Sequence, residues 1–320
     1  MSVVINTNVD ALKIQSLLSS STSNLSTSMQ RMSSGLKILS AKDDAAGTVI
    51  SAKMQVQLNG NQVAQKNVQN ATTLLSTAEG NLDVIQENVS RIRDLTLQAK
   101  NGTYSEEEIQ AMQDEVQERI EEINRVNSSA TFSQLRLFGD ADDTGALQNL
   151  AENGATFQVG ANDGTDNTIK ADKSLFQSVE FSAMTGAGNF NLVEIHKGNA
   201  DGKVTYTAPA ADTSGTLTAA TYDKAEGETA FDQAIRALDN AIDNITSRKS
   251  IIGSAGNRMD SALDTLTTQY ENLSSANSLI VDSDIAEQAS KYTQESILQQ
   301  ISTSLLAQAN QAPSVALSLV

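Results

Sequence analysis

The stretch ISAKMQVQLNGNQVAQKNVQNATTLLSTAEGNLDVIQENVSRIRDLTLQA, residues 50–99, decides the fold because one heptad pattern runs through all of it. Steps of four and three residues, counted from Ile50 to Ala99, select a mostly apolar stripe. The intermediate members are Met54, Gln57, Asn61, Ala64, Val68, Ala71, Leu75, Ala78, Leu82, Ile85, Val89, Ile92 and Thr96. Such a narrow stripe cannot bury itself, so it predicts a long helix packed against a partner helix.

A second stripe of the same kind begins at Phe231 and ends at Ile280. The two segments therefore predict antiparallel rods in a coiled-coil-like pair, each about 75 Å long at 1.5 Å per residue. A third helix is predicted over Ile109–Val126, where Ser105 is placed to cap the first turn and Glu106–Glu108 suit the positive end of the helix dipole. The fold class is mainly α.

Between the helical blocks, Gly, Asn, Asp and Thr accumulate around short alternating pieces. ATFQVGANDG (155–164) predicts a β-hairpin that turns at Asp163–Gly164. LFQSVEFSA (175–183), FNLVEIH (190–196) and KVTYTA (203–208) are also interpreted as strands or loops. Residues 184–227 are the most irregular and are predicted to form a small β-rich central insert.

The two ends of the chain predict another helix pair. The N-terminal segment has only a thin apolar stripe, so it should be marginal as an isolated helix. The C-terminal stripe loses its register at Asp282–Asp284, which mirrors the break around SSGLKILSAKDDAAG (33–47). The apolar residues of these end helices include Leu18, Leu25, Met32, Ile297, Leu298, Ile301, Leu305 and Leu306. Their uncovered surface is suited to contacts between identical copies, which form a helical filament when the rotation does not close.

Composition excludes several classes of function. The net charge is −17 and no Lys/Arg cluster is present, which argues against nucleic acid. The chain has no cysteine, so it has neither disulfides nor a Cys-based metal site. Its apolar runs are too short for a membrane helix, and its N-terminus lacks the pattern of a cleaved secretion signal.

Catalytic constellations are missing from the sequence. His196 is the single histidine, which excludes a multi-histidine zinc site and favours a solvated side chain. Asp43 and Asp44 are adjacent and would point apart on a helix, so we interpret Ser40 with Asp43 as a capping arrangement, with Asp44 in the first turn. Leu95 lies off the stripe, one turn from Arg91, and is expected on an outward face. We expect no enzyme and no cofactor.

Several long motifs together resemble bacterial flagellin. They are INTNVDAL, RMSSGLKILSAKDDAAGTVIS, SRIRDLTLQAKNGT, EVQERIEEINRV, FQVGANDG, GNRMDSAL and DIAEQASKYTQESILQQISTSLLAQANQ, in that order. The resemblance implies that residues 1–43 and 282–320 pair as the inner tube of the flagellar filament. Residues 44–183 and 228–281 would form the surrounding helical shell, and 184–227 a small outer insert.

The resemblance also implies roles for individual residues. Arg91, Leu95 and Glu115 match positions that Toll-like receptor 5 contacts in the family. Gly35 and Gly47 would give conformational freedom to the segment (the spoke) that connects the inner tube to the shell. Asp43 and Asp44 would start the long rod.

The expected function is that of a filament subunit for swimming motility. Members of the family are secreted through the flagellar type III apparatus, and an export chaperone binds their C-terminal helix beforehand. Their further partners are the proteins of the filament cap and of the hook junction. The alternative within the same class is a hook–filament junction protein. A metallopeptidase is disfavoured by the single histidine and the lack of HExxH.

Overall fold

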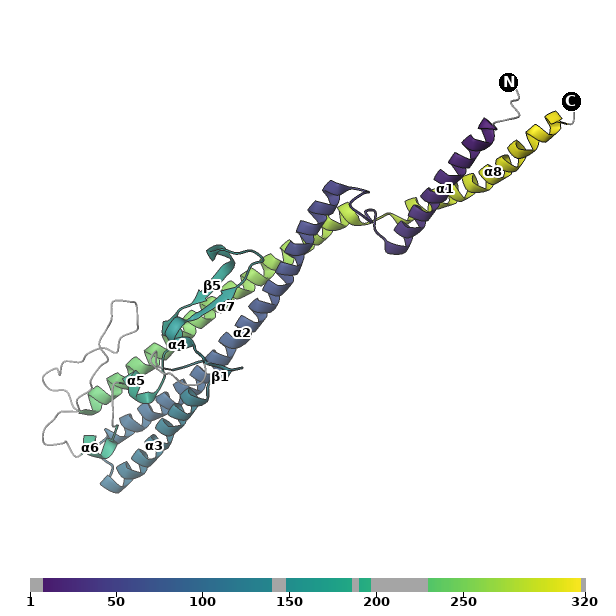
Figure 1. The fold of residues 1–320 in the computed structure, drawn as a ribbon. Coiled ribbons are helices and arrows are strands. Elements are labelled where there is room, and N and C mark those ends of the chain that lie inside the picture. The colour runs from purple at the N-terminus through teal and green to yellow at the C-terminus, as the bar shows by residue number, and fades with distance from the viewer. Residues whose placement is uncertain (1–7, 140–147, 186–189, 197–229, 318–320) are drawn as a thin grey trace. The chain divides into compact units, whose positions relative to one another are not determined.

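The computed structural model describes residues 8–139, 148–185, 190–196 and 230–317. Helices make up most of this part of the chain (Figure 1). The long ones are α1 (Val9–Ser34), α2 (Ala45–Ala99), α3 (Glu106–Ser129), α7 (Ala230–Val281) and α8 (Ile285–Leu317). The shorter ones are α4 (Leu150–Asn153), α5 (Phe181–Thr185) and α6 (Leu192–His196), with 3-10 turns at Thr165–Asn167 and Lys173–Phe176.

The contacts divide the chain into two units. Residues 1–59 and 269–320 form one unit, which we call the terminal unit, and residues 60–268 form the other, the core unit. The long helices α2 and α7 each contribute residues to both units. Among the described residues, the buried hydrophobic clusters all lie in the core unit.

In the core unit α2 and α7 pack antiparallel along the two predicted stripes. From Asn61 to Ala99 every predicted stripe residue of α2 is buried. The flanking polar pairs follow the antiparallel order, since Asp83 contacts Lys249 at 2.5 Å while Lys100, further along α2, contacts Asp232 at 2.5 Å. The fold class predicted from heptad periodicity is therefore confirmed for the long helices.

The third helix packs against α2 as an antiparallel neighbour. Ser105 caps its first turn, as predicted, and also forms a reciprocal capping box with Glu108. Ile109, Val116 and Ile123 are fully buried. Because α2 contacts α3 as well as α7, it buries a second stripe beside the predicted one, and Leu74, Asn88 and Leu95 belong to it.

The predicted stripe is wrong at its N-terminal end, within the terminal unit. Ile50 and Gln57 are exposed, while Met54 is half-buried and Leu58 buried. The buried positions Leu58, Asn61 and Ala64 follow two consecutive steps of three residues, so the pattern changes phase there. Two successive steps of three residues shift the apolar seam around the helix, and a strict heptad count does not detect this shift.

The strands are short. β4 (Ala155–Gln158) pairs antiparallel with β5 (Thr168–Ala171), so the predicted hairpin is present, with Asp163 and Gly164 in its loop. β1 (Thr131–Phe132) pairs antiparallel with β2 (Leu135–Arg136), which pairs parallel with β3 (Gln148–Asn149).

Two segments predicted as strands or loops contain short helices in place of strands. LFQSVEFSA contributes a 3-10 turn and the start of α5, and FNLVEIH contributes α6. Side-chain acceptors support the starts of these helices: the backbone N–H of Val193 donates to Asn191 Oδ1 within the segment, and that of Phe181 donates to Asn124 Oδ1 on α3. Short apolar runs do not distinguish strand from helix. The predicted strand at 203–208 and most of the predicted β-rich insert lie outside the described residues.

Candidate assembly and recognition surfaces

In the terminal unit α1 and α8 lie side by side and antiparallel (Figure 1). Asn8 Nδ2 donates to the carbonyl of Ala309 at one end of the pair. At the other end, Leu36 and Asp282 form an antiparallel bridge. The face of α1 that is covered consists of Ala11, Ile14, Leu18, Ser21, Leu25, Ser28 and Met32. These residues repeat in steps of three and four, as in a coiled-coil seam.

The matching face of α8 is largely polar. Its covered or half-covered members are Gln288, Tyr292, Glu295, Gln299, Ser302, Leu306 and Ala309. Ser21 Oγ donates to Glu295 Oε2 at 3.0 Å, and Gln299 Nε2 donates to Thr22 Oγ1 at 3.2 Å. Small and polar side chains therefore hold this pair together, with little aliphatic burial.

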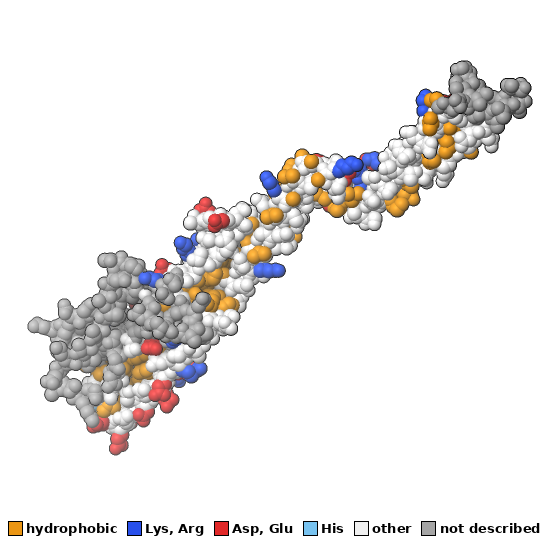
Figure 2. Space-filling model, in the orientation of Figure 1, with side chains coloured by type: hydrophobic (Ala, Val, Ile, Leu, Met, Phe, Trp, Pro, Cys, Tyr) orange, Lys and Arg blue, Asp and Glu red, His pale blue; other side chains and the backbone are white. Residues whose placement is uncertain are grey.

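The apolar residues predicted for polymerisation fall into two groups. Leu18, Leu25 and Met32 are half-buried on the seam of α1. On α8 the structure places Ile297, Ile301 and Leu305 away from that seam, with exposed fractions of 51%, 49% and 43%. Figure 2 shows hydrophobic side chains on the surface of this part of the molecule. The α1–α8 pair thus leaves an apolar face uncovered.

A shallow groove runs along this face of α8. It has a volume of about 540 Å³. Its lining is uncharged and consists of Ala286, Ala289, Ser290, Thr293, Gln294, Ile297 and Leu298. Leu298, also predicted for polymerisation, is half-buried beside it. An uncharged groove with an apolar floor fits an apolar helix face better than a charged ligand.

The segment from Gly35 to Gly47 connects α1 to α2. Gly35 ends α1 with φ +72°, in the left-handed region that glycine adopts without strain. Its carbonyl accepts from Ser283 N–H at 2.9 Å, and Lys37 N–H donates to the carbonyl of Val281 at 2.6 Å. The segment that connects α1 to α2 and the segment that connects α7 to α8 are thus joined by backbone hydrogen bonds.

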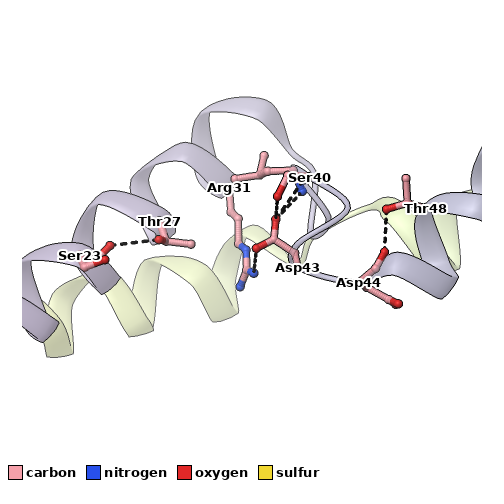
Figure 3. Close-up of polar contacts among 8 residues, drawn as sticks. Ser23, Thr27, Arg31, Ser40, Asp43, Asp44 and Thr48 are labelled. Carbon is pink, nitrogen blue, oxygen red and sulfur yellow. Dashed lines mark hydrogen bonds and ion pairs between the residues drawn. The ribbon is translucent and has the colours of Figure 1, made fainter.

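The adjacent aspartates of this connection act separately (Figure 3). Asp43 Oδ2 accepts from Leu39 N–H, Ser40 N–H and Ser40 Oγ, and these bonds lower the pKa of Asp43, the backbone bond of Ser40 most. Arg31 reaches the same carboxylate at 3.9 Å. Asp44 instead caps α2, since its Oδ1 accepts from Gly47 N–H at 2.9 Å.

Two details of the predicted connection need correction. Asp44 precedes the helix as its cap and does not lie in the first turn, because α2 begins at Ala45. Gly47 lies inside α2 and does not bend the backbone; its lack of a side chain leaves room for the side chains of Asp44 and Ile38. A Cβ at that position would stand 2.5 Å from Asp44 Oδ2 and 2.7 Å from Ile38 Cδ1.

Arg91 and Glu115 form a two-pronged ion pair between α2 and α3. Arg91 Nε and Nη2 donate to the two carboxylate oxygens of Glu115 at 2.8 and 3.1 Å. The pKa of Glu115 is lowered, mainly by this hydrogen bond. Both side chains remain partly exposed, and Arg91 also lines an acidic groove with Asp83, Glu87 and Asp94. The structure therefore brings together two of the three predicted recognition residues.

Leu95 corrects the expectation of an outward face. It is 2% exposed and belongs to the main hydrophobic cluster. The cause is the second buried stripe of α2, which packs against α3 and was invisible in a count of one seam. In this structure Leu95 therefore belongs to the hydrophobic packing of the core unit and not to an exposed surface.

Chemistry beyond these contacts is sparse. His196 is exposed and its ring lies 6.4 Å from that of Phe231. Among the described residues no group of three His, Asp or Glu side chains could hold a metal ion. Within the same ranges, no helix is both long and apolar enough to cross a membrane.

Sequence reasoning missed the residues that join α1 to α8. Glu295 and Ser21 belong to the seam, yet a search for apolar periodicity passes over them because both are polar. A heptad count that accepts polar members would have selected both. Arg31 was also missed as the cation beside Asp43.

These features define a helical structural subunit, built from paired helices with an uncovered apolar face. Two family models match the chain: the bacterial flagellin N-terminal helical region over residues 5–143, and the bacterial flagellin C-terminal helical region over residues 235–320. The chain belongs to the bacterial flagellin family. The members of this family are structural proteins and not enzymes.

Individual relatives agree with this assignment. Polar flagellin F of Vibrio parahaemolyticus is 31% identical, and the match covers 100% of both chains. The flagellin of Bacillus subtilis is 31% identical over 99% of both chains. A solved structure described as a flagellar hook-associated protein from Vibrio parahaemolyticus shares the fold with a TM-score of 0.51 and 17% identity, over 74% of this chain and 99% of that one.

Proposed function

We propose that this chain is exported by the flagellar type III apparatus and polymerises outside the cell into the flagellar filament, which serves swimming motility. The observation that carries the proposal is the uncovered apolar face of the α1–α8 pair. On α8 it comprises Ile297, Ile301 and Leu305, which lie on one side of the helix. On α1, Val9, Leu12, Leu17 and Met29 are each more than half exposed, at positions distributed around the helix. A second copy of the same pair has the surface to cover it.

The composition of the α1–α8 seam supports a folding order in which the two end helices become ordered last. Ser21, Gln288 and Ser302 bury little apolar area, so the free energy gained by pairing α1 with α8 offsets little of their ordering entropy. Burial between subunits adds the missing contribution on assembly. The same weak ends suit passage through a narrow export channel and capture of α8 by an export chaperone.

Electron microscopy of the purified intact chain tests the proposal. We expect long tubes by negative stain, and no tubes from variants that lack residues 1–43 or residues 282–320. Those truncated chains should stay folded and soluble because the hydrophobic clusters lie in the core unit. Long filaments from either truncation would contradict the assembly role of the end helices. An intact chain that forms only short collars would favour the hook–filament junction role.

Recognition by Toll-like receptor 5 is a second proposal, and the exposed Arg91–Glu115 pair supports it. Arg91→Ala should weaken receptor binding by about 1–3 kcal/mol if the guanidinium is a hot spot. Leu95→Ala should also weaken binding, but through loosened packing of α2 on α3, because Leu95 is buried. Binding measured with the soluble ectodomain separates the two: the Leu95 variant should lose thermal stability as well, whereas the Arg91 variant should keep nearly all of it.

A further inference from the structure

Glu295 is an isolated charge in the terminal unit. It is the one charged side chain from Tyr292 to the end of the chain, and residues 14–30 of α1 carry no charge at all. An isolated carboxylate would ordinarily face water, because burial of its charge costs free energy. Here Glu295 lies half-buried on the seam of α8.

Both oxygens of this carboxylate are used by α1. Oε2 accepts from Ser21 Oγ at 3.0 Å, and Oε1 accepts from Asn24 Nδ2 at 3.2 Å. Ser21 is 3% exposed, and this carboxylate is the acceptor of its buried hydroxyl. Hydrogen bonds to an ionised acceptor are stronger than bonds between neutral groups, and a buried donor without a partner is costly.

Contacts at the two ends of the pair, Asn8 with Ala309 and the Leu36–Asp282 bridge, depend on axial register, but between them the other seam side chains say little about it. Leu18, Leu25 and Met32 are spaced by seven residues, and so are Ser21 and Ser28. If α8 slid along α1 by seven residues, about 10.5 Å, Leu18 and Leu25 would exchange places in the middle of the seam, and so would Ser21 and Ser28. Packing at these positions therefore distinguishes poorly between registers one heptad apart.

Glu295 distinguishes these registers. A slide toward the start of α1 would set its carboxylate against Ile14 and Leu17, which offer no donor. A slide toward the end would set it near Ser28 and Arg31. Arg31 is already beside Asp43 at 3.9 Å, and the Leu36–Asp282 bridge joins the two connections at that end of the pair.

We propose that Glu295 sets the axial register of α8 against α1. A single polar residue in a coiled-coil seam is a well-attested way to fix register. The register decides which side chains of the pair stay uncovered, so Glu295 also selects the apolar face presented to other molecules. The inference concerns the contacts within the α1–α8 pair, in the unassembled chain whenever the two helices meet or in any assembled state, and it does not depend on how copies contact one another.

Disulfide trapping in the full-length chain tests the proposal, since the natural sequence has no cysteine. Thr22→Cys with Gln299→Cys reports the observed register, in which Gln299 Nε2 lies 3.2 Å from Thr22 Oγ1. Met29→Cys with Gln299→Cys and Gln15→Cys with Gln299→Cys report slides of one heptad in the two directions. With Glu295 in place, the first pair should oxidise in high yield and the other two at least tenfold less.

Glu295→Ala should raise the yield of a displaced pair several-fold relative to the observed pair, and Ser21→Ala with Asn24→Ala should do the same. Glu287→Gln is the matched control, because Glu287 is an exposed carboxylate that contacts Lys291 on its own helix. The control should keep the natural ratio. An unchanged ratio in Glu295→Ala would overturn the proposal, and so would loss of all three crosslinks, which would make Glu295 a source of cohesion and not of register.

Sedimentation of the same samples keeps this inference separate from filament formation. Thr22→Cys, Gln299→Cys chains that keep Glu295 and crosslink in the observed register but never sediment as polymers would count against the proposed function alone. Chains that sediment normally while Glu295→Ala leaves the ratio unchanged would count against the register inference alone.

Discussion

At the scale of single residues, Gly35 carries a backbone conformation that other residues adopt at a cost. Its φ of +72° ends α1, and nothing lies within 4 Å of a Cβ placed there, so a substitution there tests backbone strain without a clash. Gly35→Ala should destabilise α1 by about 1 kcal/mol. Gly35→Asn should cost less, because asparagine tolerates the left-handed region better.

Gly253 supplies the control for Gly35. It lies inside α7 with ordinary helical geometry, and nothing stands within 4 Å of the place that a Cβ would take. Gly253→Ala should therefore stabilise the protein by about 0.5–1 kcal/mol. Urea unfolding followed by circular dichroism at 222 nm, with hydrogen exchange of α1 amides for the Gly35 variants, measures both. Equal effects of the two alanines would contradict the assigned strain.

The lowered pKa of Glu115 predicts that the free energy of unfolding depends slightly on pH in acid. Its pKa in the folded chain is lowered from the ordinary 4.5 by the hydrogen bond from Arg91. A lowered carboxyl pKa stabilises the fold above pH 4.5, and this contribution is lost as the pH falls through the folded value. Because the pair is partly exposed, the loss should stay below about 1 kcal/mol.

Glu115→Gln should make the free energy of unfolding less dependent on pH below about 4.5. Glu118→Gln, an exposed position on the same helix, is the control and should keep the natural slope. Urea titrations between pH 3 and 7 give the comparison. A steeper acid slope in the Glu115 variant would show that the assigned sign is wrong.

At the scale of elements, buried amides of α3 hold the segment that follows the hairpin. Gln113 Nε2 donates to the carbonyl of Phe190 at 3.2 Å, and its Oε1 accepts from Leu192 N–H at 2.7 Å. Asn127 Oδ1 accepts from Val179 N–H at 3.0 Å in the same way. Gln113 thus pairs backbone groups of 190–196, and Asn127 pairs one of 175–183, the two segments that the sequence pattern indicated as strands or loops.

Gln113→Leu should destabilise the core unit by about 1–3 kcal/mol, because the Phe190 carbonyl and Leu192 N–H would be left buried without partners. Gln117→Leu makes the same chemical change one turn further along, where Gln117 is exposed and donates to Glu121 on its own helix. That control should stay within about 0.5 kcal/mol of the natural protein. Thermal unfolding by calorimetry distinguishes the two variants.

The helices also show which features of the fold a sequence pattern can predict and which it cannot. Periodicity predicted α7 from Phe231 to Ile280 and α2 from Asn61 onward because each buries one long seam. It missed the second seam that holds Leu95, since a helix with two neighbours has two buried stripes and only one stood out. It also missed Glu295, because register in a serine-rich pair depends on polar contacts that no apolar count registers.

At the scale of the whole molecule, the two units differ in what holds them together. Leu82, Ile85 and Ile92 belong to a large buried cluster, and all clustered hydrophobic residues of the described chain lie within 60–268. In the described part of the terminal unit, the buried side chains of α1 and α8 are Ser21, Ser28, Gln288 and Ser302. Local stability follows apolar burial, so the two units should open at different free energies.

Hydrogen exchange on the unassembled chain measures this difference directly. Amides of α1 and α8 should exchange within the first time points, whereas those of α2 from Leu74 to Ala99 should stay protected up to global unfolding. Assembly should then slow exchange in α1 and α8 far more than in the core unit, because a second copy covers the apolar face that carries Ile297 and Ile301. Equal protection of α1 and α2 before assembly would mean that the polar seam alone stabilises the end helices, and the proposed ordering of the ends on assembly would then be wrong.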